Sequence, residues 1–200
     1  MPFKTPILDF QAFLEARGYV RECARKVFEK DEHHARVIFL VTEEGKIEAF
    51  SYDQLGSRIL PKTGLSTDME KDVLALGMAA VAASLKAVGY FEVGEAYTMS
   101  FPPDTDLKGA LRQYHEVRKK FGSIRQMPTR IEILYIRSRY KDKVGTEVME
   151  IRRREDAPPV LLPFGKLGTE WEMEPYEPEN VTRNYIDRAI DKILSGKESR

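Results

Sequence analysis

The chain has 200 residues, of which 42% are hydrophobic and 32% are charged, and its 32 basic residues balance its 32 acidic ones. This composition is typical of a globular protein and excludes an intrinsically disordered chain, which would combine less apolar content with a large net charge. The single cysteine, Cys23, excludes an intrachain disulfide bond and a metal site built from several cysteines.

Neither an export signal nor a membrane span is predicted. Residues 1–10 contain one lysine, two prolines and no apolar run of the length that an export signal needs. The most apolar stretch, residues 73–90, contains Lys86 and consists largely of alanine and glycine, which favours a buried helix over a membrane span. We therefore expect a cytoplasmic protein with no membrane contact.

The first elements in the chain are a helix and a hairpin. Apolar periodicity predicts a helix over residues 9–30, broken or bent near Gly18. Two strands follow, over residues 36–42 and 46–52. The three residues that join them, 43–45, end in a glycine that can adopt a positive φ, which is typical of a short hairpin connection.

A long helix and a central strand are predicted next. Thr67 and Glu70 have the spacing of a capping box, which indicates the start of a helix. This helix should continue to about Val88, where Gly89 would end it. A strand is then expected over residues 91–101.

The second half of the chain repeats the alternation of helices and strands. The predicted elements are a helix over 106–121, a hairpin of strands 130–140 and 146–154 around residues 142–145, two short edge strands over 160–164 and 170–173, and an amphipathic helix over 180–195. Residues 155–179 form an irregular segment that is mainly acidic.

This order of elements predicts an α+β fold. Hairpins require antiparallel pairing, whereas the long helix between the first hairpin and the central strand can serve as a crossover. We expect a single mixed or mostly antiparallel sheet of five or more strands, built from two hairpins and a central strand, with the helices mainly on one face. Residues 1–200 should form one domain.

Three short segments resemble parts of known but uncharacterised proteins. The segments are Gly94-Glu95-Ala96-Tyr97, Pro128-Thr129-Arg130-Ile131-Glu132-Ile133-Leu134 and Glu150-Ile151-Arg152-Arg153. Their succession is similar to bacterial and phage-borne proteins that pair a Glu-Ala-aromatic strand with a later Pro-x-Arg-x-Glu strand. The resemblance would span residues 36–154 and implies a bacterial protein, but it carries no activity.

Glu95 is the candidate catalytic residue, because alternate side chains of a strand share a face and its neighbours there are apolar. A carboxylate in such surroundings is costly to bury unless it is paired, or neutral with a raised pKa. It could be a general acid–base group or an anchor for a ligand's amine, or it could form a buried ion pair with Arg137 or Arg139. A third reading leaves it exposed. Its neighbours on that face would be Phe91, Val93, Tyr97, Met99 and Phe101.

Metal and nucleotide sites have little support in the sequence. Asp104 and Asp106 follow a strand, as do carboxylates of magnesium-dependent nucleases, but the lysine usual two residues after a strand acid is absent, and capping of the next helix explains both. Adjacent histidines such as His33 and His34 point apart and chelate poorly. No glycine-rich phosphate loop and no Gly-x-Ser-x-Gly nucleophile motif is present. We predict neither a metal nor a cofactor.

Charge is unevenly distributed along the chain. Residues 108–154 contain fourteen lysines and arginines against five acidic residues. Such a segment indicates a surface for nucleic acid or another polyanion, with Tyr114, Tyr135 and Tyr140 available for stacking. Alternatively, the acidic segment 155–179 folds back and neutralises it. The residues expected to bind a ligand are Tyr97, Arg137, Arg139, Lys141, Arg152, Arg153 and Arg154.

Three functional hypotheses follow. The leading one is a noncatalytic or regulatory binding protein, because no catalytic constellation is apparent. The first alternative is a small enzyme that uses Glu95 with Arg137 or Arg139 on a polar or phosphorylated substrate; the second is a nucleic-acid or polyanion binder that uses residues 108–154. Trp171 and the apolar stripe of the last helix must dock on the chain's own core or on a second copy, and we expect a homodimer.

Overall fold

The computed structural model describes residues 9–52, 67–102, 105, 107–163, 173–175 and 185–198. Three residues considered in the sequence analysis lie outside these ranges: Asp104, Asp106 and Trp171.

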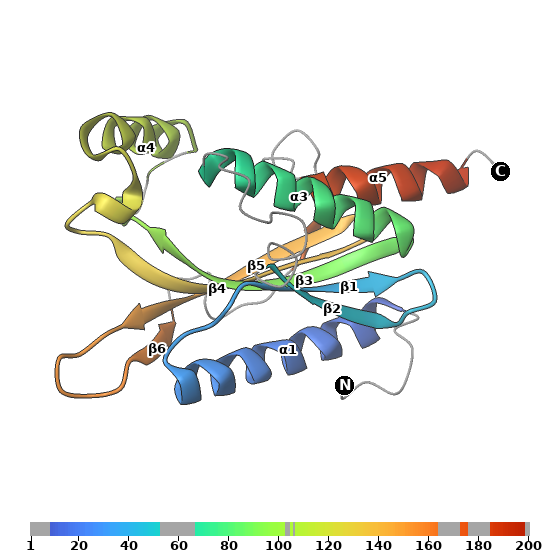
Figure 1. The fold of residues 1–200 in the computed structure, drawn as a ribbon, viewed down its shortest axis with the longest axis horizontal. Helices are drawn as coiled ribbons and strands as arrows, with labels where there is room; N and C mark the ends of the chain where they lie inside the picture. Colours follow the sequence, from blue (N-terminus) through green and yellow to red (C-terminus); the bar gives the residue numbers. More distant parts are fainter. Residues whose placement is uncertain are drawn as a thin grey trace.

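An antiparallel sheet forms the centre of the described part of the chain (Figure 1). Its strand order is β2-β1-β3-β4-β5-β6, and β7 also pairs with β5. All six strand pairs are antiparallel, which confirms the predicted α+β class. The strands are β1 (Val37–Thr42), β2 (Ile47–Ser51), β3 (Ala87–Thr98), β4 (Ile131–Tyr140), β5 (Lys143–Arg152), β6 (Val160–Pro163) and β7 (Glu174–Pro175).

Helices cover both faces of this sheet. The described helices are α1 (Phe10–Asp31), α3 (Thr67–Ser84), α4 (Leu107–Phe121), α5 (Tyr185–Glu198) and the short 3₁₀ helix η1 (Ile124–Gln126). Figure 1 shows α3 and α5 together on one face, α1 on the other, and α4 with η1 beyond one end of the sheet. The sequence pattern predicted helices mainly on one face and did not reveal that α1 lies opposite the other two.

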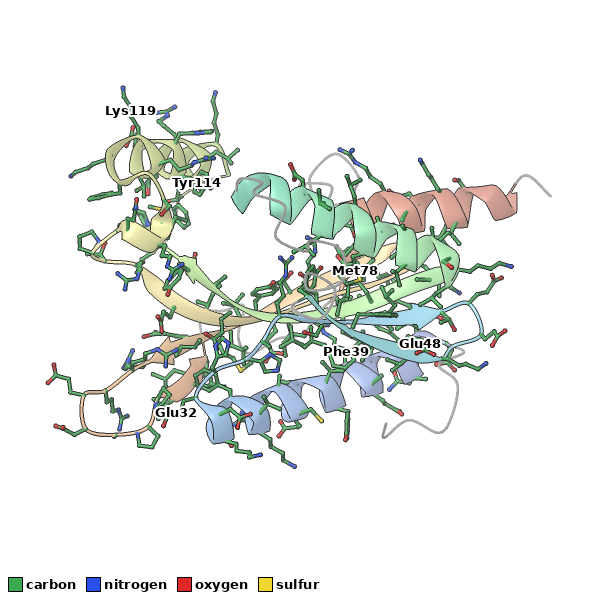
Figure 2. The ribbon with its side chains drawn as sticks, in the orientation of Figure 1. Glu32, Phe39, Glu48, Met78, Tyr114 and Lys119 are labelled. Atoms are coloured by element: carbon green, nitrogen blue, oxygen red, sulfur yellow. The ribbon has the colours of Figure 1, made fainter. Side chains whose placement is uncertain are left out.

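Two hydrophobic cores result, one on each face. Beneath the sheet, α1 contributes Phe13 and Phe28, which are fully buried against β3 and β4. On the other face, Met78 of α3 and Ile190 of α5 are fully buried against β1 and β3, and Figure 2 shows Met78 between α3 and the sheet. Strand β3 is therefore buried on both sides along its first two thirds, residues 87–94.

The junction between α3 and β3 differs from the sequence prediction. The helix expected to reach Val88 ends at Ser84, and Lys86 turns the chain with a φ of 52°. Gly89 does not end a helix but lies in β3 opposite Tyr140, where an added Cβ would be 2.5 Å from the carbonyl oxygen of Arg139. A continuous apolar run does not distinguish a buried helix from a buried strand, which explains the error.

Helix α1 is continuous through Gly18, so of the two expected alternatives, a break or a bend, the break is wrong. Asp9 caps its amino end by accepting a hydrogen bond from the backbone N–H of Ala12 (2.8 Å), and Glu32 ends it with a φ of 55°. Twenty-two residues of uninterrupted helix place its carboxyl end near the start of β1.

Both predicted hairpins form, but only the first turn lies where the sequence predicted it. Gly45 has a φ of 79°, as expected for the first turn. The second turn lies at Lys141 and Asp142 rather than at residues 142–145, and Lys141 supplies the positive φ of 52°.

The acidic segment is described only in part. β6 confirms the first predicted edge strand, and β7 begins just after the second one, so both return to the edge of β5. Among the described helices, none is long and apolar enough to cross a membrane.

Candidate functional site

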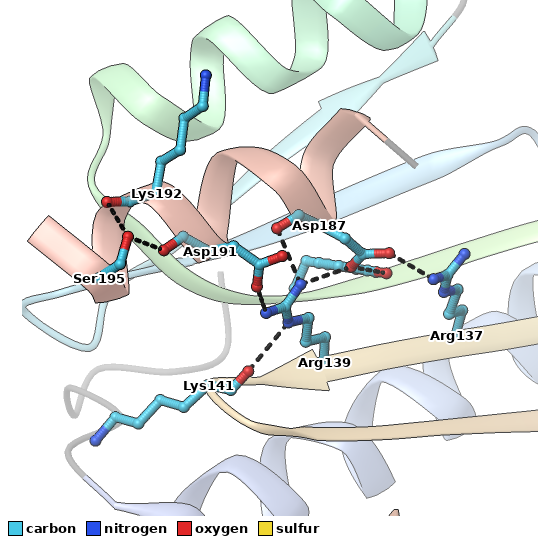
Figure 3. A network of polar contacts seen from close by, with 8 residues as sticks. Arg137, Arg139, Lys141, Asp187, Asp191, Lys192 and Ser195 are labelled. Atoms are coloured by element: carbon cyan, nitrogen blue, oxygen red, sulfur yellow. Dashed lines mark hydrogen bonds and ion pairs between the residues drawn. The ribbon is translucent and has the colours of Figure 1, made fainter. Parts of the chain in front are cut away.

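Arg137 and Arg139, two predicted ligand-binding residues, instead join the sheet to α5 (Figure 3). Arg137 Nη2 lies 2.6 Å from Oδ2 of Asp187, and Arg139 Nη1 lies 3.2 Å from its Oδ1. Arg139 also forms an ion pair with Asp191 and donates to the carbonyl oxygen of Lys141 (3.0 Å). Both guanidinium groups are thus engaged inside the protein.

The burial of this cluster indicates a structural role. Asp187 is 0% exposed and Arg139 is 1% exposed, and the hydroxyl of Tyr90 donates a third hydrogen bond to Asp187 (3.1 Å). Burial alone would lower the pKa of Arg139, yet its carboxylate partners raise that pKa above its usual value, so the group stays charged. The cluster holds α5 on the sheet.

Glu95 lies on the opposite face from both arginines. It stands opposite Leu134 in the register, whereas Arg137 stands opposite Glu92. Because directly paired residues of antiparallel strands share a face, the structure does not bring Glu95 to Arg137 or Arg139. Of the alternatives offered for Glu95, the ion pair with Arg137 or Arg139 is therefore wrong.

The half-buried Glu95 instead ties the end of α1 to the sheet. Its Oε1 accepts the backbone N–H of His34 (2.5 Å) and lies 3.2 Å from Nδ1 of His33. Its Oε2 lies 3.9 Å from Arg153, which in turn donates to the carbonyl oxygen of Glu32 (3.3 Å). These contacts fix the connection between α1 and β1.

Glu92 is the buried carboxylate that sequence reasoning missed. Its side chain is 4% exposed and its Oε1 accepts Nε of Arg36 (2.7 Å) and the hydroxyl of Tyr135 (3.3 Å). The Arg36 guanidinium also lies 4.1 Å from the ring centre of Tyr52. Gly94 was the available signal, because a strand glycine marks a close approach, and a Cβ there would be 3.1 Å from the Tyr135 hydroxyl.

Arginines gather where β3, β4 and β5 meet η1, at one end of the sheet. Arg130 and Arg125 lie 5.3 and 6.0 Å from the ring centre of Tyr97. Neither arginine forms an ion pair within the described residues. A pocket of about 380 Å³ opens beside them between the ends of β4 and β5. It is lined by Pro128, Arg130, Ile131, Glu132, Glu150, Ile151, Arg152 and Arg153.

The arginines that follow β5 complete this surface. Arg153 donates to Glu132 (2.6 Å), and this hydrogen bond is the main reason that its pKa rises above the usual value. Arg152 donates to Glu150 (3.0 Å). Arg154 is exposed and has no carboxylate partner in the described part of the chain. We call Arg125, Arg130, Arg152, Arg153 and Arg154 the basic end.

Helix α4 extends the basic end. Its last turn carries Arg118, Lys119 and Lys120, all exposed, and Figure 2 shows Lys119 projecting away from the sheet. Figure 1 places α4 and η1 at the same end of the molecule as the start of β4. These three residues add to the positive charge at that end of the molecule.

The structure separates other predicted members from this surface. Lys141 lies in the turn at the far end of the β4–β5 hairpin. Tyr140 is buried against Phe13 and Tyr135 is bound to Glu92, so of the three tyrosines expected to stack only Tyr114, half-buried on α4, is placed near the basic end. Tyr97, rather than Tyr135 or Tyr140, is the aromatic residue that lies among the arginines of the basic end.

No metal centre is assembled by the described residues, in which no three His, Cys, Asp or Glu side chains come together as ligands. His33 is exposed beside Glu95, whereas His34 turns inward and its burial lowers the pKa of its imidazole.

Family models, curated proteins and solved structures gave no match to this chain. The resemblance to bacterial and phage-borne proteins therefore stays a prediction, and function has to be argued from the chain's own residues.

Proposed function

We propose that the chain is a noncatalytic binding protein that holds single-stranded nucleic acid at the basic end. The observation that carries this proposal is the stacking of Arg125 and Arg130 around Tyr97 beside an open pocket. Guanidinium groups match phosphate oxygens with paired hydrogen bonds, and an aromatic ring offers a surface on which an unpaired base stacks. Both chemistries occur within one small area.

The scarcity of carboxylate partners among the arginines of the basic end also supports binding of nucleic acid there. Arg125, Arg130 and Arg154 have no carboxylate partner within the described residues, so binding phosphate would not require breaking an ion pair. Arg152 and Arg153 are held in place by ion pairs with Glu150 and Glu132. The negative charge of these carboxylates partly offsets the positive charge that the two arginines present to a ligand. Because the whole chain is neutral, the attraction is local and screened by salt over about 10 Å.

The proposal is tested by fluorescence anisotropy of a labelled oligothymidine at salt concentrations of about 50 to 200 mM. The logarithm of the wild-type association constant should fall linearly with the logarithm of salt concentration. The double variant Arg125→Gln, Arg130→Gln should weaken binding by about tenfold or more and reduce the slope by about 1.4, the value for two phosphate contacts on a single strand.

A matched control removes two charges at the opposite end of the hairpin. Lys141→Asn combined with Lys143→Gln changes the net charge equally, and asparagine tolerates the positive φ at position 141. This control should leave affinity nearly unchanged. Equal weakening by both double variants, or no binding at the lowest salt, would refute the proposed site.

The role of Tyr97 distinguishes nucleic acid from polyanions in general. Tyr97→Leu keeps an apolar side chain but removes the stacking ring, and we expect it to cost oligothymidine binding about 1–3 kcal/mol. Binding of heparin, which has no bases, should not change in this variant. An equal loss with both ligands would contradict base stacking.

This proposal takes the protein to be cytoplasmic and homodimeric. Ile186 and Ile190 of α5 are buried in the core of their own chain, so the apolar stripe of that helix does not require a second copy. Support for a dimer comes instead from an apolar groove of about 460 Å³ between α3 and α5, where Leu76 is 51% exposed. Sedimentation velocity tests it: Leu76→Glu should yield monomers if the groove is the interface.

A further inference from the structure

Glu147 is a buried carboxylate that lies outside the basic end. It lies on β5 opposite Ile136, so its side chain faces α1, and it is 4% exposed. Its Oε2 accepts no hydrogen bond in the described part of the chain. A buried carboxylate oxygen without a donor is costly, so this position requires a physical explanation.

A cavity of about 330 Å³ adjoins Glu147, between α1 and the edge of the sheet. This volume lies at the lower end of the range for pockets that hold small organic molecules. One wall is apolar and comes from β5 and β6; the opposite wall comes from α1 and is charged. The cavity is lined by Arg21, Glu22, Arg25, Glu147, Met149, Leu161, Leu162 and Pro163.

Among the described residues, three arginines and three glutamates lie at or beside the cavity. Helix α1 presents Arg21, Arg25 and, deeper, Arg17, and the acids are Glu22 and Glu29 on the same helix and Glu147 on β5. Both Arg21 and Arg25 lie 3.8 Å from Glu22, and Arg25 lies 3.6 Å from Glu29, all longer than a hydrogen bond. These charges balance while Glu147 is ionised, and a positive excess, which favours an anionic ligand, remains when Glu147 is protonated.

Protonation of Glu147 would increase that positive charge. Burial raises the pKa of Glu147 to about 7, against the opposing effect of Arg21, Arg17 and Arg25. Arg17 stays cationic near neutrality, although burial lowers its pKa to about 10. Near pH 7 the Glu147 carboxyl is therefore present in both forms, and its acid form can donate a hydrogen bond into the cavity.

We propose that this cavity binds a small organic carboxylate. The ligand's carboxylate would lie between Arg21 and Arg25, its apolar body would contact Met149 and Leu161, and the acid form of Glu147 would donate a hydrogen bond to it. An anion beside Glu147 favours the protonated side chain, so binding takes up a proton from solvent and strengthens as pH falls.

Isothermal titration calorimetry with hexanoate and with benzoate tests this site. Wild-type affinity should be about tenfold higher at about pH 6 than at about pH 8, and repeating the titration in buffers of different ionisation enthalpy should reveal proton uptake. Hexylamine, which has the opposite charge on a similar apolar chain, should not bind. Tighter binding of hexylamine than of hexanoate would overturn the assignment.

Two variants locate the binding to this cavity. Arg25→Gln should weaken hexanoate binding by about tenfold, the scale of one lost charged hydrogen bond, whereas Lys26→Gln, an exposed neighbour on α1 outside the cavity, should not. Glu147→Gln keeps a donor but cannot titrate, so binding should persist without pH dependence or proton uptake. If Glu147→Gln does not fold, the Arg25 comparison still decides.

The proposal fails on any of three outcomes. These are no heat of binding for either carboxylate at millimolar concentrations, equal affinity in Arg25→Gln and wild type, and an unchanged pH dependence in a folded Glu147→Gln variant. Thermal denaturation of each variant confirms that it is folded before titration.

Discussion

Arg139 and Asp187 form a buried ion pair that joins β4 to α5, with Nη1 3.2 Å from Oδ1 and the two side chains 1% and 0% exposed. Tyr90 and Arg137 also donate hydrogen bonds to the same carboxylate. A buried pair contributes little net stability compared with a well-packed apolar core, but removing one partner leaves an uncompensated charge behind. The docking of α5 therefore depends on Asp187.

Asp187→Asn should destabilise the protein by about 3–5 kcal/mol, because it leaves two guanidinium groups facing a neutral amide. Urea denaturation followed by circular dichroism measures the change. Asp191→Asn is the control: it contacts the same Arg139 but is 35% exposed, and it should cost less than half as much. Equal losses in the two variants would contradict a special role for Asp187.

Two glycines should respond to alanine in opposite directions. At Gly89 a Cβ would meet the backbone oxygen of Arg139 at 2.5 Å, which the sheet cannot relieve without shifting β3 from β4. Gly89→Ala should therefore cost about 1–3 kcal/mol or more. At Gly18, in the middle of α1, a Cβ would meet nothing within 4 Å, and Gly18→Ala should stabilise by up to about 1 kcal/mol. Thermal or urea denaturation of both variants shows whether the signs differ.

The positions of Glu92 and Glu95 show how much of the site the sequence could predict. Alternation along a strand places these two residues on opposite faces, and the register confirms this. What alternation cannot supply is the cover on each face, because that depends on helices distant in the sequence. With α1 on one face and α3 and α5 on the other, Glu92 became the buried acid and Glu95 the half-buried one.

The arginines show the same limit on what can be predicted from the sequence. The excess of positive charge over residues 108–154 is visible in the sequence, but it does not reveal which groups share a surface. Arg139 pairs with Asp187, 48 residues away in the chain, whereas Arg153 remains near the surface at the other end of the hairpin. Pairings of that separation are set by tertiary packing, and local patterns carry no record of them.

Glu92→Gln should lower the pKa of Tyr135. Burial first, and then the negative charge of Glu92, raise the pKa of this phenol to about 12. Removing the charge while keeping the burial should bring the pKa part of the way back toward its usual value near 10. NMR titration of ¹³C-labelled tyrosine measures it. Tyr140, whose pKa is raised mainly by burial, serves as an internal reference that should not move; an unchanged Tyr135 would show that Glu92 exerts no influence on it.

Glu147 should make the protein less stable as pH rises. Its pKa of about 7 in the folded state exceeds the ordinary value of 4.5, so below about pH 4.5 the group is protonated in both states and costs nothing. As pH rises toward 7, the unfolded chain releases the proton while the folded chain retains it, and stability falls by about 3 kcal/mol. His34 acts in the opposite direction, because burial lowers its pKa and stability increases as it loses its proton.

The difference in stability between wild type and Glu147→Gln isolates the effect of Glu147. Between pH 5 and 8, the free energy of unfolding of the variant should rise relative to that of wild type in urea denaturation. Lys26→Gln, an exposed neighbour on α1 outside the cavity, should run parallel to wild type, and a parallel course for Glu147→Gln would exclude a raised pKa at that position.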